Sequence, residues 1–127
     1  MQIVSVPAEA MVDPALNLTS IVERHASDTS NPVLYRWQMS PGNWQDIHAH
    51  QFHDMVVSVA KGLIAHGVKP GDRIGIMSRT RFEWALIDFA IWYAGAISVP
   101  IYETNAPAQV AWALSHSEAQ AIFVEND

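Results

Sequence analysis

The feature that most limits how this sequence can fold is a regular alternation of short apolar runs and helical segments in its second half. Three runs are predicted strands, Arg73–Met77, Ile97–Ile101 and Ala121–Val124, with helices predicted at 80–94 and 105–117 between them. Strand, helix, strand, helix, strand at this spacing predicts an α/β fold with right-handed crossovers and a parallel sheet. Such a sheet needs cover on both faces, and no predicted helix follows the third strand. We therefore expect an incomplete N-terminal subdomain of a larger fold.

The boundaries of the first crossover helix follow from local signals. Thr80 and Glu83 have the spacing of a capping box, and Gly95 stands where helices commonly end in the left-handed conformation. The segment between them is apolar almost all round, because its only charged residues are Arg81, Glu83 and Asp88. We expect this helix to be covered on more than one side.

The first half of the chain predicts a β-hairpin between two helices. Residues 16–26 and 49–66 carry apolar residues at helical spacing, and Gly67 follows the second helix as a left-handed end. Residues 33–37 and 43–47 are predicted strands, and the turn between them is Ser40-Pro41-Gly42-Asn43. Residues 1–14 are expected to be an irregular lead-in, and residues 1–127 to form one N-terminal subdomain.

Three histidines stand at the start of the long helix 49–66. His48, His50 and His53 could bind zinc or nickel, because neutral imidazoles are good ligands for both metals. His48 and Gln51 also have the spacing of a weak capping box. The chain has no cysteine and no zinc-protease signature, so we favour the capping role and predict no metal site.

Composition excludes several classes of protein. Half of the residues are hydrophobic and 16% are charged, which argues against intrinsic disorder and indicates a surplus of apolar surface. The net charge of −6, without a basic cluster, argues against nucleic-acid binding. The uncharged run 89–102 contains Pro100 and falls short of the roughly 20 apolar residues that span a bilayer. With no signal peptide recognised, we expect a cytoplasmic protein, with peripheral membrane contact as an alternative.

Candidate binding residues lie in the loop after the first parallel strand, at the sheet edge where α/β proteins bind ligands. Backbone N–H groups at the helix start could hold a phosphate or carboxylate together with Arg79 and Arg81, beside Ser78 and Thr80. Neither glycine-rich phosphate motif is present. We therefore favour the alternative in which Thr80 caps the helix and the two arginines are solvated.

The corresponding loop after the second strand reads Tyr102-Glu103-Thr104. Glu103 could act as an acid or base and Tyr102 could line a pocket. A lone carboxylate without a partner is more often a surface residue, so no catalytic residue is assigned. The weak cofactor-binding candidates of the two loops are Ser78, Arg79, Thr80, Arg81, Tyr102 and Thr104.

Motifs over most of the chain resemble those of the adenylate-forming (AMP-binding) enzymes. Residues 67–84 resemble the N-terminal region of that family, and residues 93–104 are most similar to its long-chain fatty-acid–CoA ligases. The second likeness rests on Val99-Pro100-Ile101-Tyr102 followed by Thr104. Residues 115–119 and 122–124 are similar to the family's next helix and strand.

The resemblance implies an enzyme that activates a fatty acid with ATP and Mg²⁺ to acyl-AMP and pyrophosphate, then transfers the acyl group to CoA. The family's phosphate loop, later nucleotide motifs and catalytic lysine are absent from these 127 residues. We therefore expect a chain that is inactive alone, binds no cofactor itself and packs against the remainder of the same polypeptide.

Two other hypotheses stay open on the sequence alone. The chain could be a stand-alone module that binds a nucleotide or CoA phosphate at residues 78–81. It could instead be a non-enzymatic module that self-associates through an open sheet edge.

Overall fold

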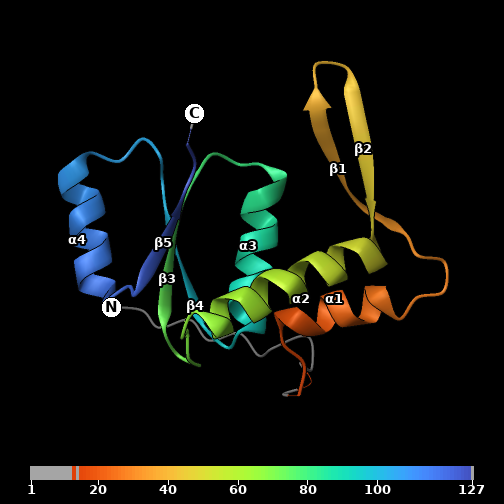
Figure 1. The fold of residues 1–127 in the computed structure, drawn as a ribbon, viewed down its shortest axis with the longest axis horizontal. Coiled ribbons are helices and arrows are strands. Elements are labelled where there is room, and N and C mark those ends of the chain that lie inside the picture. Colours follow the sequence, from red (N-terminus) through yellow and green to blue (C-terminus); the bar gives the residue numbers. More distant parts are fainter. Residues whose placement is uncertain (1–12, 14, 127) are drawn as a thin grey trace, which may run out of the picture.

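A computed structural model describes residue 13 and residues 15–126 (Figure 1). The elements follow in the order α1 (Leu18–Ala26), β1 (Val33–Ser40), β2 (Asn43–His48), α2 (Ala49–Ala65), β3 (Arg73–Met77), α3 (Phe82–Tyr93), β4 (Ile97–Ile101), α4 (Pro107–Ser117) and β5 (Ala121–Val124). The predicted lead-in, 1–14, falls outside the described residues except for Asp13.

The predicted parallel sheet is confirmed, with strand order β4-β3-β5. β3 is central, and its last residue, Met77, lies opposite Ile101 of β4 and Val124 of β5. Ile74 and Ile76 of β3 are 0% exposed. A Cβ atom on Gly75 between them would lie 2.9 Å from Ile122 Cγ1, so close packing of the β3–β5 pair requires glycine there.

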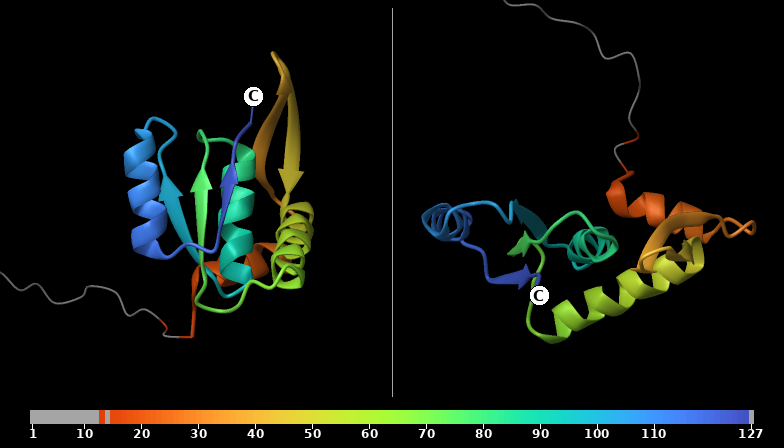
Figure 2. Two further views of the ribbon diagram at one scale, coloured as in Figure 1. Left: turned by 60° about the vertical axis from the view of Figure 1, so that its left-hand side comes forward. Right: turned by 90° about the horizontal axis from the view of Figure 1, so that it is seen from above.

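Helices cover the two faces of the sheet unequally. The β3–α3–β4 crossover moves toward one edge of the sheet, and the β4–α4–β5 crossover moves back toward the other edge. Because such crossovers are right-handed, α3 and α4 lie on opposite faces of the sheet. Figure 2 shows this arrangement, with α1 and α2 packed on the side of α3 away from α4. The prediction that α3 is covered on several sides is confirmed. By contrast no residue of α4, all of which the structure describes, is fully buried.

The hairpin extends beyond the helices (Figure 1). β1 and β2 pair antiparallel through the predicted turn, where Gly42 has a φ of +79°. β1 continues to Ser40, three residues past the predicted end, because its pairing with β2 runs up to Asn43. The base of the hairpin joins the core, since Tyr35 lies 4.7 Å from Phe52, centroid to centroid.

Both predicted capping boxes are wrong. The N-cap of α3 is Arg81, so Thr80 lies outside the helix, and the Glu83 carboxylate binds the Arg81 guanidinium instead of the backbone N–H of Thr80. A full ionic pair outcompetes a bond to a neutral N–H group.

His48 is the N-cap residue of α2, as expected, but Gln51 does not complete a box with it. The backbone carbonyl oxygen of Asn31 lies 2.8 Å from His48 Nδ1. The side-chain Oδ1 of Asn31 accepts a hydrogen bond from the His50 backbone N–H at 3.0 Å. The cap therefore comes from the loop before β1, a contact between residues 19 apart in the chain.

The predicted helix ends are confirmed. Gly67 and Gly95 have φ values of +93° and +75° directly after the caps of α2 and α3. After α2, Val68 N donates to Leu63 O and Gly67 N donates to Ile64 O, which together form a Schellman motif. In the part of the chain that the structure describes, no helix has both the length and the apolar character needed to cross a membrane.

Candidate functional site

The loop after β3 and the residue after β5 meet at the carboxyl edge of the sheet. Ser78 begins the loop after β3, and Glu125 follows β5 directly. Glu125 N donates to Met77 O at 3.1 Å, which extends the β3–β5 ladder by one bond. The parallel register therefore aims the Glu125 side chain at the Ser78–Arg81 loop and the start of α3.

The Glu125 carboxylate accepts hydrogen bonds from three residues of this loop. Oε2 accepts from Ser78 Oγ at 3.1 Å and from Arg79 N at 3.0 Å. Oε1 accepts from Arg79 Nη2 at 2.8 Å and from Arg81 Nη1 at 3.0 Å. The Glu125 side chain is only 13% exposed, whereas those of Arg79 and Arg81 are 67% and 43% exposed. The carboxylate thus lies beneath the two guanidinium groups.

Arg81 also binds a second carboxylate. Its Nε and Nη2 atoms donate to the two oxygens of Glu83 at 2.7 and 2.8 Å, a bidentate pair. Two arginines and two glutamates therefore balance in charge. Hydrogen bonds from Arg79, then from Ser78, lower the pKa of Glu125 to about 2. The hydrogen bond from Arg81 likewise lowers the pKa of Glu83.

The structure brings together three of the four candidates in the first loop. Ser78, Arg79 and Arg81 converge on Glu125, while Thr80 is exposed and lies outside α3. Both arginines are exposed to solvent, as expected, but each also forms an ion pair that the sequence did not predict. Sequence reasoning missed Glu125, although a charged residue directly after the third parallel strand must reach the same edge.

The candidates of the second loop lie apart from this cluster in the sequence and are exposed. Tyr102 is 77% exposed, and its carbonyl oxygen accepts from Asn105 N at 3.0 Å in a turn before α4. Glu103 and Thr104 are exposed in the same loop. A binding role for Tyr102 and Thr104 stays a prediction.

A cleft of about 530 Å³ separates the hairpin from the Ser78–Arg81 loop. Its walls include Trp37 and Trp44 of the hairpin and the paired side chains of Arg79, Arg81 and Glu125. Because Arg79 and Arg81 form ion pairs with Glu125, one wall of the cleft carries little net charge, and the wall formed by the hairpin is largely aromatic.

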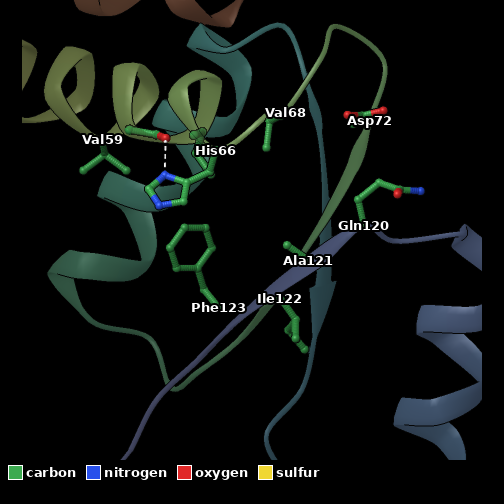
Figure 3. Close-up of a pocket in the computed structure, with 11 residues that line it drawn as sticks. Val59, His66, Val68, Asp72, Gln120, Ala121, Ile122 and Phe123 are labelled. Carbon is green, nitrogen blue, oxygen red and sulfur yellow. Dashed lines mark hydrogen bonds between the residues drawn. The ribbon is translucent and has the colours of Figure 1, made fainter.

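A second hollow, of about 660 Å³, lies between α2 and β5 (Figure 3). Val59, Leu63 and Val68 line its helix side, and Ile122 and Phe123 its strand side. His66 lies in this groove, with Nδ1 2.8 Å from Gly62 O. This largely apolar groove, which the sequence did not predict, is a surface suited to packing rather than to chemistry.

The three histidines near the start of α2 have different neighbours. His48 contacts Asn31, whereas His53 pairs with Glu23 and Asp54 at 3.5 and 3.4 Å. Within residue 13 and residues 15–126, no three His, Cys, Asp or Glu side chains are grouped to hold a metal ion.

Comparison with known proteins connects this geometry to one family. The sequence profile described as AMP-binding enzyme matches residues 22–127. The long-chain-fatty-acid–CoA ligase FadD15 of Mycobacterium bovis is 42% identical over 127 residues, which is all of this chain and 21% of that relative. The chain therefore spans about a fifth of the length of this relative.

Solved structures agree on the fold. The fatty acid AMP ligase of Legionella pneumophila has a TM-score of 0.74 at 21% identity, over 83% of this chain and 19% of that one. The N-terminal subdomain of Klebsiella oxytoca NpsA has a TM-score of 0.73 at 16% identity, over 86% and 27% of the two chains. On the profile match over residues 22–127 and the likeness to part of FadD15 along the whole of this chain, the chain belongs to the AMP-binding enzyme family.

Proposed function

We propose that this chain is the N-terminal part of a long-chain fatty-acid–CoA ligase. The observation that carries the proposal is the 42% identity to the M. bovis ligase along the whole chain. The complete enzyme would join a fatty acid to AMP with release of pyrophosphate from ATP. It would then pass the acyl group to the thiol of CoA with release of AMP.

In this proposal the chain is a scaffold and performs no chemical step alone. The Ser78, Arg79 and Arg81 donors already bind Glu125, so this set does not fit an added phosphate without displacing that carboxylate. ATP, Mg²⁺ and CoA would bind residues of the remainder of the enzyme. The alternative of a stand-alone nucleotide-binding module is not favoured by this geometry.

The proposed partner is the remainder of the same polypeptide, which would also supply the fatty-acid site. The apolar α2–β5 groove and the thinly packed α4, where Trp112 is 65% exposed, offer it surfaces to cover.

Self-association through a sheet edge is the competing proposal, since β4 and β5 are the outer strands among the described residues. A cytoplasmic location, with peripheral membrane contact as an alternative, completes the proposal, and no nucleic-acid partner is proposed.

A chimera tests the proposal. This chain would replace the matching segment of the M. bovis ligase, and AMP release dependent on palmitate and CoA would be measured. We expect the chimera to retain activity and this chain alone to show none.

Two controls make the result interpretable. The ligase without its matching segment should be inactive, and a chimera carrying Phe52→Ala, which removes a core ring, should be unstable. A chimera that folds with the melting temperature of the parent, binds ATP and yet makes no acyl-CoA would overturn the proposal. Size-exclusion chromatography of this chain alone tests self-association separately.

A further inference from the structure

Glu125 stands where an anionic ligand would be held at the start of α3. Its carboxylate receives a hydroxyl group, a backbone N–H and two guanidinium groups at 2.8–3.1 Å. These are the kinds of donor that bind phosphate and carboxylate ligands in proteins. Here a side chain of the protein itself provides the anion.

The sheet fixes this placement. Val124 pairs with Met77, and Glu125 N donates to Met77 O, so the backbone holds the residue in register with the end of β3. Its side chain is 13% exposed, less than either arginine that covers it. The arrangement therefore differs from a solvent-exposed ion pair, which contributes little to structure.

The charge of the cluster leaves little attraction for a further anion. Arg81 is shared between Glu83 and Glu125, and Arg79 binds Glu125. Two positive and two negative side chains cancel. A phosphate would have to displace a carboxylate that the strand ladder keeps in place.

We propose that Glu125 is a positioning residue that serves as the resident anion of the Ser78–Arg81 loop. It holds the loop against the carboxyl edge of the sheet and closes that edge to phosphate-bearing ligands. The inference concerns residues of this chain alone and does not depend on the proposed ligase activity.

Anion rescue tests the inference. The thermal unfolding of wild type, Glu125→Ala and Glu125→Gln would be followed with rising inorganic phosphate at constant ionic strength. We expect phosphate to leave the wild-type melting temperature at its chloride value. Glu125→Ala should melt lower and regain stability in a saturable manner as phosphate takes the vacated donors. Glu125→Gln, which keeps the shape but loses the charge, should respond less.

Two control variants separate this site from general effects of charge. Asp46→Ala removes another arginine–carboxylate pair, with Arg36 at 2.9 Å, and should gain no response to phosphate. Glu125→Ala combined with Arg81→Ala should lose the response, because a main phosphate donor is gone.

A second measurement covers the case in which Glu125→Ala does not fold. In NMR titrations of Glu125→Gln, the Arg79 amide signal should move at a phosphate concentration at least about tenfold lower than in wild type, since a charge-assisted hydrogen bond is worth about that factor. Equal responses in wild type and variants, or no response in any variant, would overturn the inference.

Discussion

At the scale of single residues, Glu125 shows how one carboxylate can join three segments. It connects the end of β5 to the loop after β3 and, through Arg81, to the first turn of α3. Hydrogen bonds from Arg79 are the largest cause of its lowered pKa. A group whose pKa is lower in the folded chain stabilises that chain in its ionised form.

The pH dependence of stability follows from this shift. The pKa of Glu125 falls from its usual 4.5 to about 2, so its contribution is complete above pH 4.5 and disappears as the pH drops toward 2. We expect the difference in unfolding free energy between wild type and Glu125→Gln to be constant near neutrality and to shrink across that acidic range. Urea unfolding followed by circular dichroism at a series of pH values measures it. Curves that stay parallel down to pH 2 would show that the ionised carboxylate contributes nothing.

At the scale of elements, the helices begin and end by different means. The ends of α2 and α3 are local, because a glycine in the left-handed conformation follows each helix cap. The start of α2 depends on Asn31, a residue of the preceding loop whose own φ is +44°. Asparagine tolerates that conformation better than most residues, so one residue serves both the loop and the cap.

Replacement of Asn31, which caps α2, should destabilise the protein, whereas replacement of Gln51, which the sequence pattern suggested as part of the cap, should not. We expect Asn31→Ala to cost about 1–2 kcal/mol, through the lost cap and the positive φ. Gln51→Ala, an exposed position, should stay within about 0.5 kcal/mol of wild type. Asn31→Gly separates the two causes, because glycine accepts the positive φ. Chemical denaturation measures all three, and equal stability of Asn31→Ala and Gln51→Ala would refute the role of this cap.

At the scale of the whole molecule, one aromatic cluster connects the hairpin to the α/β layer. Phe52 of α2 lies 4.7 Å from Tyr35 of β1, 6.2 Å from Phe82 and 5.7 Å from Phe89 of α3, between ring centroids. It is 1% exposed. The base of the hairpin therefore shares the main core, although its tip extends away from it.

The cluster predicts a large effect of removing its central ring. Phe52→Ala should destabilise the chain by about 3–5 kcal/mol, through lost burial and a cavity. Trp44→Ala removes a larger ring that is 56% exposed, near the tip of the hairpin, and should change stability by less than about 0.5 kcal/mol. Urea unfolding compares them. A cost below about 1 kcal/mol for Phe52→Ala would mean that the hairpin and helices do not share a core.

The sequence predicted some residues of the candidate site but not how they pair. The sequence placed Ser78, Arg79 and Arg81 at the carboxyl edge, because strand order in the chain sets which loops leave a parallel sheet there. It did not pair them with Glu125, since residues 44 to 47 apart come together only through the strand register. A groove such as that between α2 and β5 also has no local pattern.

The sequence by itself determined the elements, the parallel sheet and the glycine helix ends. The elements follow from the alternation of apolar runs along the chain, and the helix ends follow from glycines that adopt a positive φ, so both depend only on neighbouring residues. Only the tertiary structure decided which partners the charged and polar side chains would take. Glu83 paired with Arg81 instead of forming a capping box with Thr80, Asn31 capped a helix that begins 18 residues later at Ala49, and Glu125 filled the anion position. The physical reason is that such partners are chosen by proximity in space among competing donors, which no short stretch of chain encodes.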